Sequence, residues 1–124
     1  MKIFDTCLDE VKVLVPKKFH DDRGYFQETF NSHAYIENLK YLNDLFVQDN
    51  ESCSKKGVVR GMHWQIPPMA QSKLVRCLRG KIIDIIADIR HGSPTFGKHC
   101  QVELTPENNY QVFIPEDLLM DSLL

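Results

Sequence analysis

The sequence predicts an all-β chain that folds as an antiparallel sandwich or barrel, and three observations support this fold class. Six or more short segments rich in β-branched and aromatic residues follow one another at regular spacing. Turn signals with Gly, Pro or Asn separate them, as in KKG, HGSPTFG and TPENN. A single segment has helical periodicity, so the strand–helix alternation of a βαβ fold is missing. The 124 residues suffice for one domain, residues 1–124, with one core.

The composition indicates a globular protein rather than a membrane or nucleic-acid-binding one. Hydrophobic residues make up 43% and charged residues 26% of the chain, and the net charge of −2 provides no broad basic field. The start, MKIFDTCLDE, is acidic and lacks a cleavage site, so we expect a cytoplasmic protein. Four widely spaced cysteines without a C-x-x-C pair predict reduced, structural thiols.

Local patterns assign the elements in chain order. Val11, Val13 and Val15 alternate before Pro16 as in a half-buried strand, and residues 25–30 repeat that character. One short helix is predicted near 32–41, because Asn31 or Ser32 can cap it and Tyr35, Leu39 and Leu42 recur at helical spacing. The further strand candidates are residues 45–52, 57–65, 73–80, 81–90, 97–104 and 110–115.

Alternation also predicts which strand residues share a face. In 81–90, Ile83, Ile85, Ala87 and Ile89 lie on one side, and the other side carries Asp84, Asp88 and Arg90. In 73–80, Lys73 shares a face with Val75 and Cys77, which places a lysine among apolar residues.

Strict alternation in 57–65 puts Arg60 and His63 on opposite faces. The two side chains can reach one pocket only if the strand bends between them. Because Gly61 is a natural position for a β-bulge, we predict a bulge there.

Three clusters of polar residues can take part in binding or catalysis. They are Arg23, Phe26 and Glu28 after the DDRG turn; Gln48, Asp49 and Asn50; and Arg60, His63 and Lys73. Guanidinium groups bind phosphate in a bidentate way and amides read hydroxyl groups, so this mixture suits an anionic, polyhydroxylated ligand.

His63 is the candidate base, because an imidazole accepts and returns protons near neutral pH. Lys73 and Arg60 could then stabilise an oxyanion such as an enolate. The alternatives stay open at this point: a single strand histidine is more often structural, and both cations could be solvated charges of edge strands. A metal site is disfavoured, because no second histidine forms a compact ligand pair with His63.

Several longer motifs, in order and over about residues 11–116, carry a specific resemblance. DDRGYFQETF, FVQDNESCSKKGVVRGMHWQ, PPMAQSKLVRCLRG, DIRHGSPTFGK and VELTPENNYQVFIPE resemble the dTDP-4-dehydrorhamnose 3,5-epimerase family. The resemblance implies a cupin-like jelly-roll barrel and a homodimer. It also implies double epimerisation of a nucleotide-linked 4-keto-6-deoxyhexose, without a metal or redox cofactor, on the route to dTDP-L-rhamnose.

The same resemblance implies roles for individual residues. His63 matches the catalytic base and Lys73 the cation that stabilises the enolate. The residues that match substrate-binding positions, some of them supplied across the dimer, are Arg23, Phe26, Glu28, Gln48, Asp49, Asn50 and Arg60.

The resemblance stops after Glu116, where DLLMDSLL stands in place of a Gly-Phe-Ala-His-Gly-Phe-like segment. Loss of one base from codons for that segment yields Asp-Leu-Leu-Met-Asp-Ser, so we hypothesise a frameshift and a barrel that is incomplete at the C-terminus. The general acid would lie in the missing part. The competing expectation is therefore a non-catalytic dimeric remnant that binds nucleotide sugar weakly or not at all.

Overall fold

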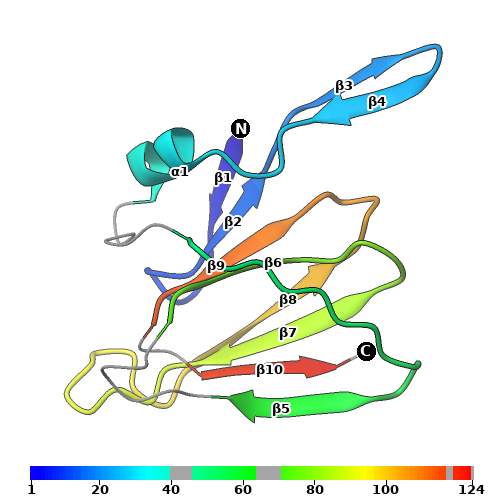
Figure 1. Cartoon of the computed structure of the whole chain (residues 1–124). Coiled ribbons are helices and arrows are strands. Elements are labelled where there is room, and N and C mark those ends of the chain that lie inside the picture. Colours follow the sequence, from blue (N-terminus) through cyan, green and yellow to red (C-terminus); the bar gives the residue numbers. More distant parts are fainter. Residues whose placement is uncertain (40–45, 64–70, 117–118, 124) are drawn as a thin grey trace.

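The computed structural model describes residues 1–39, 46–63, 71–116 and 119–123, with the backbone alone for residues 62–63 and 119–123. Within these residues, two four-stranded antiparallel sheets lie beside each other, and a two-stranded hairpin projects away from them (Figure 1). The first sheet has the order β1 (Lys2–Asp5), β2 (Lys12–Val15), β9 (Gln111–Ile114), β6 (Lys73–Arg76). The second has the order β5 (Val59–His63), β10 (Leu119–Leu123), β7 (Ile82–Ala87), β8 (His99–Leu104). The predicted all-β antiparallel architecture is confirmed.

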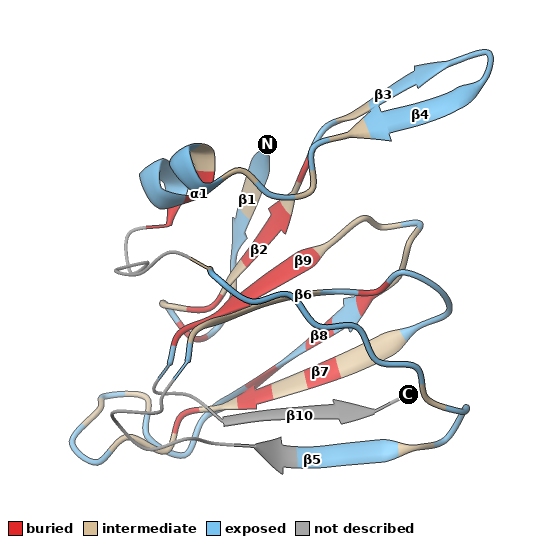
Figure 2. Cartoon of the chain, in the orientation of Figure 1, coloured by how far each residue is buried: buried red, intermediate tan, exposed pale blue. Residues whose placement is uncertain are grey.

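The main core lies between the two sheets, and Figure 2 shows buried residues along β2, β9, β7 and β8. The cluster contains Leu8, Val11, Val13, Cys77, Ile86, Cys100, Val102, Leu104, Val112 and Ile114. The first sheet is buried on both faces, because Phe113 of β9 and Leu14 of β2 pack into a second cluster with Tyr35 of the helix. Apolar side chains therefore pack against both faces of β9, which contributes to both hydrophobic clusters and lies at the centre of the fold.

The helix α1 (Ser32–Asn38) confirms the predicted short helix. Asn31 caps it, since its side chain accepts a hydrogen bond of 3.2 Å from the backbone N–H of Ala34. Tyr35 and Leu39 are buried, as the helical spacing predicts, whereas Leu42 lies outside the described residues.

The strand predictions were right for β2, β4 (Gly24–Gln27) and β5 to β9, and wrong at one place. Residues 46–52 form no strand, and Val47 is 92% exposed. Among the described strands none pairs with this segment, so its strand propensity alone does not make it a strand. Three strands were not predicted, namely β1, β10 and β3 (Lys18–Asp21), which pairs with β4 in the projecting hairpin.

The alternation predicted for β7 is confirmed, and its core side is the one with the acidic residues. Asp84 and Asp88 are 0% exposed, as is Ile86 between them, whereas Ile83 and Ile85 are half-buried. A hydrophobic pattern alone would have turned this strand the other way.

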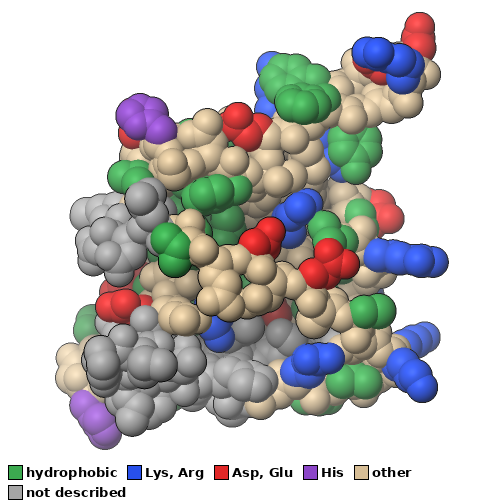
Figure 3. All heavy atoms as spheres, viewed as in Figure 1, with side chains coloured by type: hydrophobic (Ala, Val, Ile, Leu, Met, Phe, Trp, Pro, Cys, Tyr) green, Lys and Arg blue, Asp and Glu red, His purple; other side chains and the backbone are tan. Residues whose placement is uncertain are grey.

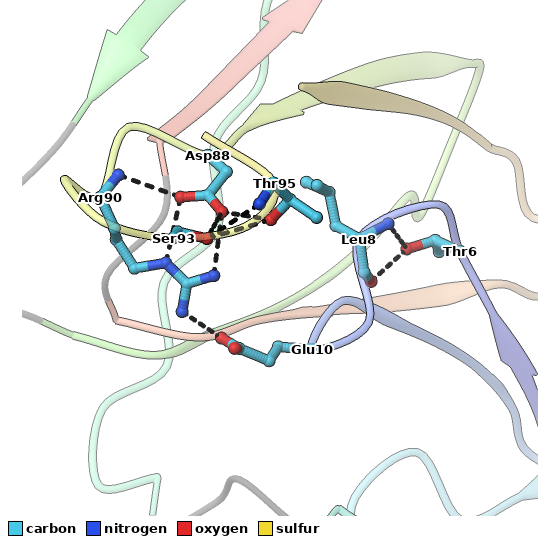
Figure 4. Close-up of polar contacts among 7 residues, drawn as sticks. All are labelled: Thr6, Leu8, Glu10, Asp88, Arg90, Ser93 and Thr95. Atoms are coloured by element: carbon cyan, nitrogen blue, oxygen red, sulfur yellow. Dashed lines mark hydrogen bonds and ion pairs between the residues drawn. The ribbon is translucent and has the colours of Figure 1, made fainter. Parts of the chain in front are cut away.

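A network of polar contacts around Asp88 explains why this acid is buried (Figure 4). Its carboxylate accepts hydrogen bonds from the backbone N–H, Nε and Nη2 of Arg90, each at 3.0 Å, and from the hydroxyls of Ser93 and Thr95. Nη1 of Arg90 donates to Glu10 Oε2 at 2.6 Å, which ties the loop after β7 to the turn between β1 and β2. The hydrogen-bonded Arg90 guanidinium is the main cause that holds the pKa of Asp88 well below its ordinary value.

Candidate functional site

A register shift in β5 lies between the two site residues of that strand. Met120 of β10 is opposite His63 and Ser122 is opposite Arg60, so two residues of β5 face one residue of β10. This is the β-bulge that the sequence predicts at Gly61. Regular alternation would put Arg60 and His63 on opposite faces, because an odd number of positions separates them. The extra residue in the bulge brings both positions to the same face of the sheet.

The register across the second sheet identifies that face. Met120 is also opposite Ile86, and Ser122 is opposite Asp84, both fully buried toward the core. Directly opposed residues share a face, so the positions of Arg60 and His63 belong to the side of the sheet that faces the core. The side chain of His63 lies outside the described residues, whereas that of Arg60 is exposed and donates from Nε to Ser54 Oγ at 2.7 Å.

Lys73 occupies the corresponding face of the first sheet. It opens β6 opposite Ile114, which is 1% exposed and part of the main core. Its strand neighbour Val75 and the following Cys77 pack on the same core, as alternation predicts. The side chain of Lys73 is half-buried. Because β6 and β5 are the edge strands opposite to β1 and β8, Lys73 and the positions of Arg60 and His63 lie along the same edge of the two sheets.

The second predicted cluster lies on the segment that leads to β5. Gln48, Asp49 and Asn50 are exposed, and Gln48 Nε2 donates to Asn50 Oδ1 at 3.3 Å. Residues 46–58 run from the side of α1 to the start of β5 (Figure 1). The amides are therefore free to turn toward a ligand without breaking a buried contact.

The third predicted cluster is on the β3–β4 hairpin and does not join Lys73 within this chain. Phe26 is 72% exposed, and the side chain of Arg23 is 91% exposed. Figure 1 shows the hairpin directed away from both sheets, and Figure 3 shows hydrophobic side chains on the surface along it. The Arg23 side chain contacts Asp21 at 2.8 Å and lowers the pKa of that carboxyl.

Hydrogen bonds from α1, from β9 and from the turn before β9 hold the base of the hairpin on either side of the exposed Glu28. The carbonyl of Thr29, the next residue, accepts hydrogen bonds from the Tyr35 hydroxyl at 2.9 Å and from Gln111 Nε2 at 2.8 Å. The Tyr35 hydroxyl also contacts Gln111 Oε1 at 2.6 Å. Burial raises the pKa of Tyr35 to about 12. Asn109 Nδ2 donates to Oε1 of Gln27, the last residue of β4, at 2.8 Å and so fixes the end of this strand.

Sequence reasoning assigned no role to Asp84, although the structure places it close to the site. It is fully buried, and the register puts it in one row with Ser122 and the position of Arg60. A carboxylate in a low-dielectric interior strongly affects nearby cations and titrating groups. The signal that could have found it is a single acid within the apolar run IIDIIA.

The described residues hold no group of three or more His, Cys, Asp or Glu side chains arranged to bind a metal ion. No helix in the described part of the chain is long and apolar enough to span a membrane. A surface pocket of about 590 Å³ lies between β1 and β8, lined among others by Phe4, Cys7, Cys100 and Tyr110. It contains none of the predicted site residues, because β1 and β8 are the sheet edges opposite to β6 and β5.

Comparisons with known proteins agree with this geometry. A sequence model of the dTDP-4-dehydrorhamnose 3,5-epimerase family matches residues 5–120. The dTDP-4-dehydrorhamnose 3,5-epimerase of Shigella flexneri is 47% identical over 116 residues, covering 94% of this chain and 64% of that protein. The chain thus spans less than two thirds of the length of the curated relatives that it matches.

Solved structures show the same similarity. The crystal structure of RmlC from Legionella pneumophila in complex with dTDP-4-keto-L-rhamnose has a TM-score of 0.94 at 44% identity, covering 99% of this chain and 64% of that one. The epimerase from Elizabethkingia anophelis has a TM-score of 0.92 at 41% identity, covering 100% of this chain and 67% of that one. The described strands therefore follow the cupin-like fold of these proteins.

Proposed function

This chain belongs to the dTDP-4-dehydrorhamnose 3,5-epimerase family, and from that premise we propose that it carries the proton-abstracting half of a nucleotide-sugar epimerase site. The proposed substrate is of the dTDP-4-keto-6-deoxyglucose class. A related structure contains dTDP-4-keto-L-rhamnose and another contains TDP and PPi, which supports a thymidine nucleotide sugar. The expected compartment is the cytoplasm, in keeping with four free cysteines.

The observation that supports the proposal is that the positions of His63 and Lys73 lie on the facing sides of two sheets. The bulge at Gly61 turns the positions of Arg60 and His63 toward the core side, and Lys73 occupies the facing side of the first sheet. Epimerisation next to a ketone needs a base to remove the C–H proton and a cation for the enolate oxygen. In this proposal His63 is the base, Lys73 stabilises the enolate, and Arg60 binds the substrate phosphates.

The remaining predicted residues are proposed to bind the nucleotide sugar. Gln48, Asp49 and Asn50 would contact it from the segment before β5. The hairpin cluster of Arg23, Phe26 and Glu28 would reach the site of a second copy in a homodimer. Three exposed aromatic side chains on the hairpin support this, since Phe19, Tyr25 and Phe26 are 55%, 59% and 72% exposed.

Deuterium exchange tests the proton-abstracting role directly. The chain is incubated with dTDP-4-keto-6-deoxyglucose in D₂O, and deuterium at C3 and C5 is followed by NMR. We expect exchange at C3 at least, reduced about 100-fold or more in His63→Asn and Lys73→Gln. Lys81→Gln is the matched control, because Lys81 is an exposed lysine in the turn before β7.

The outcomes separate the two functions that the sequence left open. Exchange that survives in Lys81→Gln but not in Lys73→Gln supports the epimerase site. No exchange in the wild-type chain, with an unchanged circular dichroism spectrum, identifies a non-catalytic remnant and refutes the proposal.

Mixing two inactive variants tests the homodimer. Arg23→Ala damages the hairpin and Lys73→Gln damages the barrel, so a hybrid dimer retains one intact site. Random exchange of subunits then restores about a quarter of the wild-type rate. A mixture with no more exchange activity than its components would show that the hairpin serves its own chain or none.

A further inference from the structure

Two cysteines from distant parts of the sequence meet at the edge of the sandwich opposite the candidate site. Cys7 is exposed in the turn after β1, and Cys100 is buried in β8. Both line the pocket between these two edge strands. The other two cysteines, Cys53 and Cys77, do not line this pocket.

The contacts around the two thiols bring them within reach of each other. The Cys7 thiol donates to the backbone carbonyl of His99 at 3.3 Å. That oxygen is about 2.3 Å from the nitrogen of Cys100 across the peptide bond. The side chains of Cys7 and Thr6 both interact with the Cys100 thiol. A disulfide then requires the Cys7 side chain to rotate away from the carbonyl and toward Cys100.

The local structure holds this pair together in the folded chain. The Thr6 hydroxyl lies 2.8 Å from the carbonyl of Leu8 (Figure 4). It also lies 2.8 Å from the carbonyl of Val11, so it closes the turn. Leu8, Val11 and Cys100 belong to one buried cluster. The turn with Cys7 is thus packed against β8, and the two sulfurs share a high effective concentration.

We propose that Cys7 and Cys100 form a reversible disulfide in response to a peroxide, which fastens the turn after β1 to β8 across the pocket. The exposed Cys7 thiol gives up its proton as its sulfur attacks the peroxide; the O–O bond breaks, one oxygen stays on the sulfur as a sulfenic acid, and the other leaves as hydroxide, which takes up the proton to become water. The Cys100 sulfur then attacks the Cys7 sulfur, and the sulfenic hydroxyl leaves as water. In total two thiols lose two protons and two electrons, and one hydrogen peroxide becomes two waters.

Burial decides the order of these steps. Cys100 is shielded from solvent, and burial raises the pKa of its thiol to about 11, so peroxide reacts first at the exposed Cys7. Cys100 gives up its proton only as its sulfur attacks the adjacent sulfenic acid. The resting pair is the dithiol, and both cysteines are free in the structure. The disulfide would join the turn after β1 to β8, an edge strand of the second sheet.

Peptide mapping of the full-length chain tests the proposal. Reduced protein is treated with a few equivalents of hydrogen peroxide, blocked with N-ethylmaleimide and digested with trypsin. The expected product links peptide 3–12 to peptide 99–124, and its mass is lower by about 2 Da than the sum of the two reduced peptides. Treatment with dithiothreitol should remove this product. Peptides with Cys53 and Cys77 remain alkylated.

Two variants and a stability measurement sharpen the result. Cys53→Ser removes the other exposed thiol and should leave the linked peptide unchanged, whereas Cys7→Ser should abolish it without disturbing the core. Oxidation should raise the thermal midpoint by about 10 °C in wild type and Cys53→Ser, and not in Cys7→Ser, because the bond closes a long loop. Sulfinic acid at Cys7 with Cys100 still alkylated, or covalent dimers through Cys7, would overturn the proposal.

Discussion

Asp88→Asn measures how far the fold depends on a buried ion pair, and the chain provides its own exposed reference. Asp21 and Asp88 make the same local contacts, since each accepts hydrogen bonds from the backbone N–H, Nε and Nη2 of the arginine two residues later. Asp88 is 0% exposed, whereas the side chains of Asp21 and Arg23 are 51% and 91% exposed. Asp88→Asn and Asp21→Asn therefore change the same Asp–Arg contact, once in a buried and once in an exposed position.

The expected cost follows from the partners of Asp88. An amide in place of the carboxylate removes the charge opposite Arg90 and leaves the Ser93 and Thr95 hydroxyls without a full set of acceptors. Breaking a buried ion pair costs about 3–5 kcal/mol. The lower end applies here, because the Arg90 side chain is 27% exposed and keeps its 2.6 Å contact with Glu10. With a urea m-value of about 2 kcal/mol/M, a loss of about 3 kcal/mol lowers the unfolding midpoint by about 1.5 M.

The assay is equilibrium unfolding in urea at pH 7, followed by circular dichroism, for wild type, Asp88→Asn and Asp21→Asn. Asp21→Asn should leave the midpoint unchanged, because water replaces the lost contacts. Ser93→Ala removes a single hydrogen bond and should give a small shift that can be measured even where Asp88→Asn unfolds the chain. Equal midpoints for Asp88→Asn and Asp21→Asn would refute the reasoning.

The pH dependence provides a second readout of the same pair. The pKa of Asp88 is lower in the folded than in the unfolded chain, where it is about 3.9. Its stabilising contribution is therefore present above pH 4 and is lost as the pH falls toward the folded-state pKa. The gap in unfolding free energy between wild type and Asp88→Asn should narrow as the pH falls from 5 to 3. A constant gap would show that the charge of Asp88 does not matter.

Three smaller predictions concern the helix and its attachment. Tyr35→Phe leaves Gln111 Oε1 without its hydroxyl donor and should cost about 1–2 kcal/mol in urea unfolding, while the exposed Tyr25→Phe should cost nothing measurable. Because burial raises the pKa of Tyr35 to about 12, the stability tied to its neutral form should decline between pH 10 and 12, and absorbance at 295 nm should show one late-titrating tyrosine that disappears in Tyr35→Phe. Asn31→Ala removes the cap on the Ala34 N–H and should cost about 1 kcal/mol, with a matching loss of ellipticity at 222 nm; an unchanged midpoint would exclude a capping role.

Local sequence patterns predicted the elements whose signals are local. The helix follows from the Asn31 cap and the spacing of Tyr35 and Leu39, and these are interactions within a few residues. The bulge at Gly61 follows from the odd spacing of Arg60 and His63. Both predictions combine a residue preference, Asn at a helix cap or Gly at a bulge, with a requirement on side-chain position. The requirement is a shared helix face for Tyr35 and Leu39, and a shared strand face for Arg60 and His63.

The errors occur where pairing decides the structure. Residues 46–52 have strand propensity, but no strand in the described part of the chain pairs with them. Residues 119–123 lack alternation and yet form β10, because β5 and β7 flank them on both sides. For β7, alternation identified both faces, but the choice of the core face depended on Arg90, which pairs with Asp88 from outside the strand and is itself held by Glu10. Strand periodicity does not report such long-range partners.

The position of β10 links the end of the described chain to the candidate catalytic residues. In the order β5-β10-β7-β8, β5 joins its sheet through β10. The opposed pairs Met120 with His63 and Ser122 with Arg60 fix which side of β5 faces the core, and the same two residues of β10 are opposite Ile86 and Asp84. A slip of β10 by one residue would carry its whole set of partners to the other face. The face of the sheet on which the positions of His63 and Arg60 lie is therefore set by the register of a strand that itself supplies none of the predicted site residues.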